Sequence, residues 1–215
     1  MRKSFLIATT LFVISGHSIY AQDSLRNSLA LVPQYLFVQG FRLDYERKLL
    51  NPKNTIIVVS YFYKGITSDS NILGEFRDDH LTGYGLELHF NHIIINDFNG
   101  RADYYVSAGT GFKHYKITYD GFGWEPYIEN GLQLLRQVEV EQYLKINRFE
   151  LIFLMGDKHY FNERIFIDMY LGVAILFPSF NESQKNGRDY RSRFIDYGSE
   201  GVSLRLGLKI GAILN

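Results

Sequence analysis

The features that this sequence lacks exclude several classes of protein. Its 215 residues contain no cysteine, which excludes a disulfide framework, a thiolate metal site and a cysteine nucleophile. The formal net charge is zero, so the composition gives no indication of a nucleic acid or an acidic partner. Beyond the N-terminal region, no uninterrupted apolar run approaches the roughly 20 residues of a transmembrane helix. A glycine-rich phosphate loop and a zinc motif are also missing.

Aromatic residues, in contrast, are unusually frequent. They make up 16% of the chain, with 16 Tyr and 17 Phe. Aromatic side chains favour β-strands, and they are enriched where a protein meets lipid head groups. The composition therefore favours β structure and is compatible with a membrane interface.

The N-terminus has the layout of a secretory signal peptide. Arg2 and Lys3 form a basic start, an apolar run follows over 5–14, and "SIYAQ" places the small residue Ala21 before a cleavage point. The apolar run is too short to cross a bilayer as a helix. We therefore expect residues 1–21 to be removed, and residues 22–215 to form the exported domain.

The rest of the chain repeats an alternation of apolar and polar residues. In the tail "GVSLRLGLKIGAILN", every second residue from Val202 to Leu214 is apolar, while Arg205 and Lys209 lie on the other face. The segments 41–47, 84–92 and 164–177 repeat this pattern. A period of two predicts strands with one apolar and one polar face.

The complete pattern predicts eight strands, over 28–38, 40–48, 55–65, 81–92, 102–118, 141–156, 164–177 and 201–214. Short connections alternate with longer polar ones such as 66–80, 119–140 and 178–200. This rhythm predicts an all-β fold, an eight-stranded antiparallel up-and-down transmembrane β-barrel with short periplasmic turns and longer extracellular loops. The strands are also long enough for a tilted strand to cross the hydrocarbon layer, which takes about 9–11 residues.

The signal peptide, the eight amphipathic strands and the segment "LDYER" at 43–47 resemble small outer-membrane β-barrel proteins of Gram-negative bacteria. The architecture is similar to the eight-stranded barrel of the outer membrane protein A family over the whole mature chain. The resemblance rests on pattern and carries no catalytic motif. It implies a location in the outer membrane and contact with outer-membrane lipid.

The energetic cost of placing a charged side chain in lipid indicates which face of each strand points outward. An Arg or Lys on the lipid side at mid-membrane costs about 2–4 kcal/mol, so the charged faces are expected to point inward. Because side chains fill the interior of an eight-stranded barrel, the sequence predicts a packed polar core rather than a pore. The predicted lumen charge network consists of Arg42, Asp44, Glu46, Glu87, His89, Asp103, Arg148, Glu150, Arg164, Asp168, Arg205 and Lys209. Within it, Arg205 and Lys209 are expected to meet the carboxylates of Asp44 and Glu46.

One segment changes phase. From Val138 to Ile146 the even positions are apolar, whereas from Phe149 to Met155 the odd positions are. A switch near Asn147 indicates either a β-bulge or a strand that continues beyond the membrane with packing of its own.

Candidate chemical sites are few. Glu87, His89 and Asn91 share one strand face, but a hydrogen-bonded interior histidine is the better interpretation, so no metal, cofactor or catalytic residue is predicted. Lipid A deacylases, which are also eight-stranded barrels, use a His-x-Ser motif that the mature sequence lacks. The aromatic segment "YDGFGWEPY" offers a loop contact site for a partner or a surface polysaccharide, with Tyr119, Phe122, Trp124 and Tyr127.

The leading hypothesis is therefore a non-enzymatic outer-membrane barrel with a structural or interaction role, including that of an accessory subunit of a larger complex. Its expected partners are outer-membrane lipid and outer-membrane or periplasmic proteins. The alternatives are a soluble periplasmic lipocalin-like barrel that binds an apolar ligand, and a lipid-modifying enzyme of the outer membrane. The polarity of the two faces distinguishes the membrane barrel from the soluble lipocalin-like barrel, because a soluble barrel is apolar within and polar outside.

Overall fold

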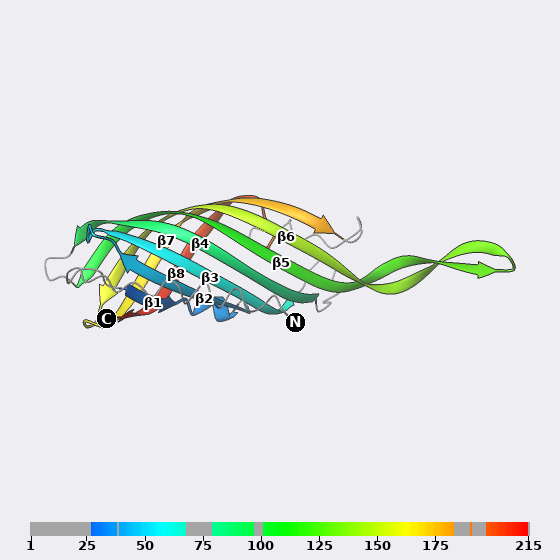
Figure 1. Ribbon diagram of the computed structural model, residues 1–215, viewed down its shortest axis with the longest axis horizontal. Helices are drawn as coiled ribbons and strands as arrows, with labels where there is room; N and C mark the ends of the chain where they lie inside the picture. The colour runs from blue at the N-terminus through cyan, green and yellow to red at the C-terminus, as the bar shows by residue number, and fades with distance from the viewer. Residues whose placement is uncertain are drawn as a thin grey trace.

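Eight antiparallel strands close into one barrel (Figure 1). This computed structural model describes residues 27–37, 39–67, 79–96, 101–182, 190 and 197–214, so the predicted signal peptide lies outside the described residues. Every strand pairs with its neighbours in sequence, and β1 pairs with β8, which confirms the predicted up-and-down topology. The elements are β1 (Asn27–Leu31), α2 (Gln34–Phe37), β2 (Gly40–Lys48), β3 (Asn54–Thr67), β4 (Asp79–Asn96), β5 (Ala102–Glu129), β6 (Leu132–Tyr160), β7 (Ile165–Glu182) and β8 (Gly201–Leu214).

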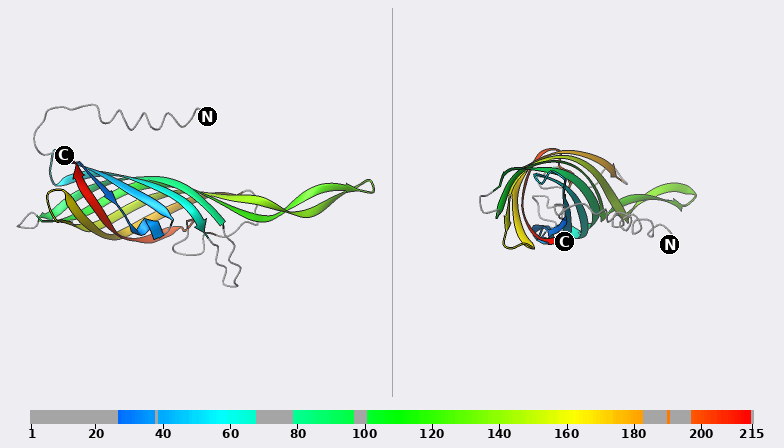
Figure 2. Two further views of the ribbon diagram at one scale, coloured as in Figure 1. Left: turned by 90° about the horizontal axis from the view of Figure 1, so that it is seen from below. Right: turned by 60° about the vertical axis from the view of Figure 1, so that its left-hand side comes forward.

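A long hairpin projects from one end of the barrel (Figures 1 and 2). The segment 119–140 was expected to be a loop, but β5 continues to Glu129 and β6 begins at Leu132. Asn130 and Gly131 join the strands with φ angles of 52° and 80°, as a type I′ turn requires. The prediction was wrong here because glycines and a proline interrupt the alternation, although the Asn-Gly pair was a hairpin signal.

The outside of the barrel carries an apolar belt. Large apolar side chains alternate along each wall strand and are exposed there, for example Leu86, Leu88 and Phe90 on β4 and Val202 to Ile210 on β8. The side chains between them point inward, and many are charged. This polarity is opposite to that of a soluble lipocalin-like barrel and is the polarity of a barrel that spans a membrane. The expected transmembrane fold class is thus what the structure presents.

The phase change near Asn147 has no bulge. β6 pairs with β5 in continuous register from Leu132 to His159, and the even residues point inward on both sides of Asn147. After Asn147 in the sequence, the inward residues include the charged Arg148 and Glu150. Before it, toward the hairpin, they include Leu144 and Ile146, which join an apolar cluster. The structure thus excludes the bulge at Asn147 and shows a continuous strand with apolar packing at Leu144 and Ile146. The irregular register lies instead between Ile93 and Ile95, where β4 meets β5.

The first strand is shorter than predicted. It ends at Leu31, because Pro33 has no backbone N–H for the sheet and the chain forms the one-turn helix α2. In the described part of the chain, no helix has the length and apolarity to cross a bilayer.

β8 is therefore paired with β1 only over Ile210–Leu214. Beyond that point, the side-chain amide of Gln34 pairs with Leu208 as a strand would. In the orientation that satisfies both groups, it donates to the Leu208 carbonyl at 2.9 Å and accepts from its N–H at 3.1 Å. The closing strand thus needs α2 as well as β1 to complete the wall.

Candidate functional site: the barrel interior and the projecting hairpin

Lys209 is the centre of one buried charge cluster. Its Nζ lies 3.1 Å from Asp44, 3.4 Å from Asp168 and 3.8 Å from Glu46, so it joins carboxylates of β2 and β7. Arg42 also pairs with Asp44, through a bidentate contact of 2.7 and 2.9 Å. All of these side chains are buried. Opposite charges and hydrogen bonds at this distance offset part of the large cost of removing ions from water.

Glu150 and Glu87 form a second cluster, on the hairpin side of the first. Lys113, which is 0% exposed, lies between them, with Nζ 2.9 Å from Glu87 and 3.2 Å from Glu150. Glu150 also receives Arg148 at 2.8 Å and Arg205 at 2.6 Å. One carboxylate is therefore the shared counter-ion of three cations, from β5, β6 and β8.

Inward-facing glycines make room for these side chains. A Cβ at Gly109 would lie 2.5 Å from the His89 ring, and one at Gly111 would lie 2.6 Å from Cγ of Glu87. A Cβ atom is essentially never found this close to a non-bonded atom, so His89 and Glu87 occupy space that a larger neighbour would take. The interior is thus packed to the level of single methyl groups.

A layer of tyrosines fills the interior on the hairpin side of the charged residues. Tyr61, Tyr63 and Tyr115 are buried, and Tyr35 of α2 and Tyr197 pack against them with ring centroids 4.9 to 6.4 Å apart. We call these five residues the tyrosine cluster. It contacts the charges directly, since Lys113 Nζ lies 4.1 Å from the centroid of the Tyr61 ring and Tyr61 donates to Glu87 at 2.8 Å.

Little empty space is left between the two layers. The cavity bounded by Arg42, Tyr61, Glu87 and Tyr170 measures about 10 Å³. That volume holds no more than about one water molecule. Together with the tyrosine cluster, these side chains fill most of the interior between the described strands.

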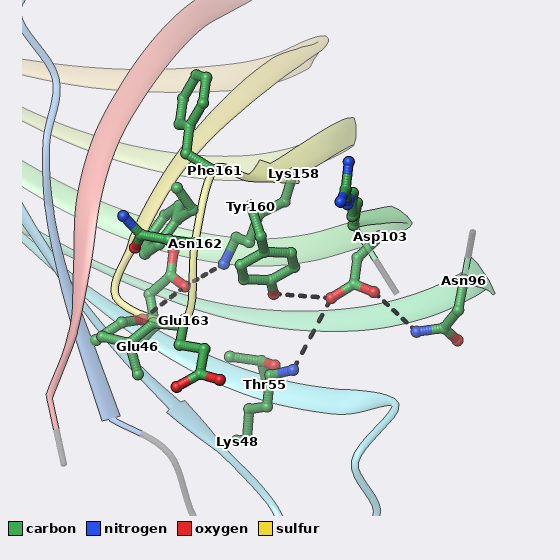
Figure 3. A pocket seen from close by; sticks show the side chains of 14 residues that line it. Glu46, Lys48, Thr55, Asn96, Asp103, Lys158, Tyr160, Phe161, Asn162 and Glu163 are labelled. Carbon is green, nitrogen blue, oxygen red and sulfur yellow. Dashed lines mark hydrogen bonds and ion pairs between the residues drawn. The ribbon is translucent and has the colours of Figure 1, made fainter. Parts of the chain in front are cut away.

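A larger pocket of about 480 Å³ opens at the end of the barrel opposite the hairpin, beside the beginning of β1 and the end of β8 (Figure 3). Asp103 organises its wall by accepting hydrogen bonds from Tyr160 and Asn96, both at 2.8 Å, and pairing with Lys48 at 3.8 Å. Lys158 pairs with Glu46 at its floor. Its charges are thus largely matched to one another, and the pocket ends at the packed interior.

Ser107, His89 and Glu87 lie in a row that resembles a nucleophile, a base and an acid. The Ser107 hydroxyl is 3.5 Å from His89 Nδ1, and His89 Nε2 is 2.9 Å from Glu87. All three are buried, and the adjoining space beside Ser107 and His89 has no measurable volume for a substrate. Glu87 is also held by Lys113 and Tyr61, so the row is part of the packed interior.

The structure places most of the predicted network inside the barrel. Arg164 is the exception: it lies exposed in the turn before β7, where its carbonyl accepts from Ile213 N–H at 2.7 Å, so its inward assignment was wrong. Arg205 pairs with Glu150 and not with the expected Asp44 or Glu46. The eleven residues that point inward are Arg42, Asp44, Glu46, Glu87, His89, Asp103, Arg148, Glu150, Asp168, Arg205 and Lys209.

Two central cations were missed. Lys113 lies on the inward face of β5, ten residues after Asp103 and therefore in phase with it, so the period of two was a sufficient signal. Lys158 lies beyond the predicted end of its strand at residue 156, and the structure extends that strand to Tyr160. Both pair with predicted network residues.

The predicted loop contact residues are split between two environments. Phe122 and Trp124 are 56% and 67% exposed on one face of the hairpin, and Tyr127 is half-exposed on the other. Tyr119 is buried beside the tyrosine cluster, so it does not belong to an exposed contact site.

No set of three or more His, Cys, Asp or Glu side chains within the described ranges is arranged to hold a metal ion. His89 of the Glu87, His89 and Asn91 face is instead engaged by Glu87.

No protein-family model matches the chain, and no curated protein matches it. Among solved structures it is similar to a major outer membrane protein from Thermus thermophilus, with a TM-score of 0.49 and 11% identity over 89% of this chain and 100% of that one. It is also similar to CarO of Acinetobacter baumannii, with a TM-score of 0.36 and 11% identity over 90% of this chain and 99% of that one. Both likenesses are distant, and the function is inferred from the barrel's own geometry.

Proposed function

We propose that the protein is a non-enzymatic, integral outer-membrane barrel that conducts no solute and presents its hairpin outside the cell for a contact with another molecule. The single observation that supports this most strongly is the filled interior. Lys113 is completely buried between Glu87 and Glu150, and the tyrosine cluster packs directly on it. A barrel of eight strands that is filled in this way serves as a rigid anchor.

The absence of catalysis is supported by the same packing. The Ser107, His89 and Glu87 row is the arrangement that favours the competing enzyme hypothesis. Acyl transfer would require a carbonyl carbon to reach the Ser107 hydroxyl, with donors placed for the oxyanion. The packed surroundings leave no space for either.

The interaction role is supported by the hairpin. β5 and β6 extend past the described ends of β4 and β7 and carry exposed aromatic residues into water. Exposed Trp and Phe side chains on a protruding element are common anchors of protein interfaces. A role as an accessory subunit of an outer-membrane complex is one form of this interaction, and outer-membrane lipid contacts the apolar belt.

Conductance and labelling test the proposal together. Reconstituted into planar lipid bilayers, the purified chain is expected to give no stepwise currents, whereas an open porin reconstituted in parallel gives them. Ser107 is expected to remain unlabelled by a fluorophosphonate that labels an accessible triad serine. Regular single-channel openings would contradict the sealed interior, and covalent labelling that Ser107→Ala abolishes would favour the enzyme.

A further inference from the structure

We propose that one face of the hairpin binds a cationic protein surface outside the cell, an inference that rests on the interaction role proposed above. We call this face the Trp124 face. It is formed by alternate residues of the two strands, and its members are Asp120, Phe122, Trp124, Pro126 and Ile128 of β5 and Gln133, Leu135, Gln137, Glu139 and Glu141 of β6.

Within the part of the chain that the structure describes, the hairpin beyond the barrel is a ribbon of two strands. The pairing of β4 with β5 ends at Thr118, and the pairing of β7 with β6 ends at Leu144. From there to the Asn130–Gly131 turn, the two strands pair with each other and with no other described residue. An isolated two-stranded hairpin is marginally stable in water, so a partner that covers one face would stabilise it.

The Trp124 face offers an apolar stripe to such a partner. Phe122, Trp124, Ile128 and Leu135 are between 56% and 78% exposed, although they are large and apolar. Pro126 stands directly opposite Leu135 and continues the stripe. Aromatic residues in this setting supply the binding energy of protein interfaces, particularly tryptophan.

The same face carries three carboxylates at the barrel end of the stripe. Asp120 stands directly opposite Glu141, and Glu139 stands opposite Phe122. Like charges directly opposite each other on a sheet face are destabilising. No ion pair to a described residue neutralises these three carboxylates, and the nearest lysines on this face, Lys116 and Lys145, lie a further four residues toward the barrel.

The opposite face of the ribbon is different. One of its two carboxylates is paired within the ribbon, since Arg136 contacts Glu125 at 2.6 Å, and the other, Glu129, accepts a hydrogen bond from Tyr127 at 3.3 Å. Gly121 and Gly123 contribute no side chain to this face, so near the barrel Val138 and Val140 of β6 form it. The Trp124 face thus brings together the exposed Phe122 and Trp124 side chains and three carboxylates without an ion pair to a described residue.

Charge selects the chemistry of the partner. Residues 119–142 carry five acidic side chains and one basic side chain, a net charge of −4. This charge repels phosphate-bearing head groups and also a second copy of the hairpin. The described carboxylates do not form a metal-binding set. The surface that fits is a protein with Lys or Arg side chains beside an apolar cleft.

Photo-crosslinking in cells that carry the full chain tests this proposal. A photoreactive amino acid replaces Trp124 in one variant and Leu132, which is 65% exposed on the opposite face, in the matched control. A protein adduct is expected at position 124 and not at 132. The crosslinked protein is then identified, purified and titrated against the full chain in detergent. Insertion of each variant is checked by its heat-dependent mobility on gels.

The titration is expected to show a salt-sensitive affinity. The triple variant Asp120→Asn, Glu139→Gln, Glu141→Gln should bind about tenfold more weakly at low salt and lose the salt dependence. Trp124→Ala should weaken binding by about thirtyfold, the effect of a hot-spot residue. The control pair Glu125→Gln, Glu129→Gln, on the other face, should bind like the unaltered chain.

The contrary results distinguish a failure of the cationic-partner proposal from a failure of the interaction role proposed for the hairpin. A protein adduct at Leu132, or an unchanged affinity of the triple variant, would overturn the cationic partner on the Trp124 face while the hairpin remained an interaction site. An adduct with lipopolysaccharide would replace the protein partner by a polysaccharide. Inserted variants without an adduct at either position would overturn the interaction role itself.

Discussion

The ammonium of Lys209 lies 3.1 Å from the carboxylate of Asp44, although β1 separates their strands, so this pair joins the two sides of the barrel seam. Lys209→Met keeps much of the side-chain volume but leaves Asp44 and Asp168 without this cation. Loss of one partner of a buried ion pair costs about 3–5 kcal/mol, so the free energy of unfolding in lipid vesicles should fall by that amount. Lys116→Met, on the exposed outer rim, is the control and should change little. Equal stability of both variants would show that Lys209 is not a structural cation.

The ion pairs of Glu150 predict which of two substitutions destabilises the barrel more. Arg205→Ala removes one of three cations from Glu150, which keeps Lys113 and Arg148. Glu150→Gln leaves all three without this carboxylate, so it should lower the unfolding midpoint in urea considerably more. Measurement of both variants in the same vesicles gives the order directly. A larger effect of Arg205→Ala would mean that Glu150 is not the shared counter-ion.

The inward glycines predict a contrast between adjacent residues. Gly109→Val places methyl groups against the His89 ring and should cost about 1–3 kcal/mol through overpacking. Ala108→Val is the matched control, because its side chain is exposed on the outer face. Refolding yield and unfolding free energy should drop only for the first variant. Equal losses would contradict the assignment of faces on β5.

Much of this fold could be predicted because each wall strand separates lipid-facing from interior residues with a period of two. The alternation at Val202–Leu214 located β8 and assigned Lys209 to the interior. The pattern does not specify which strands approach across the barrel, so Arg205 was matched to the wrong carboxylates. It also failed over 119–140, where exposed apolar residues occur on both faces of a ribbon without a core.

The tyrosine cluster could not be foreseen for a related reason. Leu144 and Ile146 are apolar and point inward, whereas Arg148 and Glu150, on the same face, are charged. The interior changes from charged to aromatic along the barrel axis, so polarity alone does not report direction. Pro33, which ends β1, was the one local signal for α2.

The apolar belt predicts depth-dependent costs for a charge. Leu88→Arg, in the middle of the β4 belt, should destabilise the inserted barrel by about 2–4 kcal/mol, whereas Thr82→Arg, on the same face near the rim, should cost about 0–1 kcal/mol. Folding of both variants into vesicles and titration with denaturant measure the difference. In a soluble barrel the two substitutions would be equally harmless.

The central claim is that the alternating outer face of the barrel lies in lipid while the inner face is packed. Its most direct test places spin labels on β4 of the vesicle-inserted protein, at residues 82, 86, 88, 90 and 92, and measures collisions with oxygen and with a water-soluble nickel complex. The expected result is high oxygen and low nickel access at 86, 88 and 90, with nickel access restored at 82 and 92. Equal nickel access at all five positions would contradict a membrane-spanning barrel.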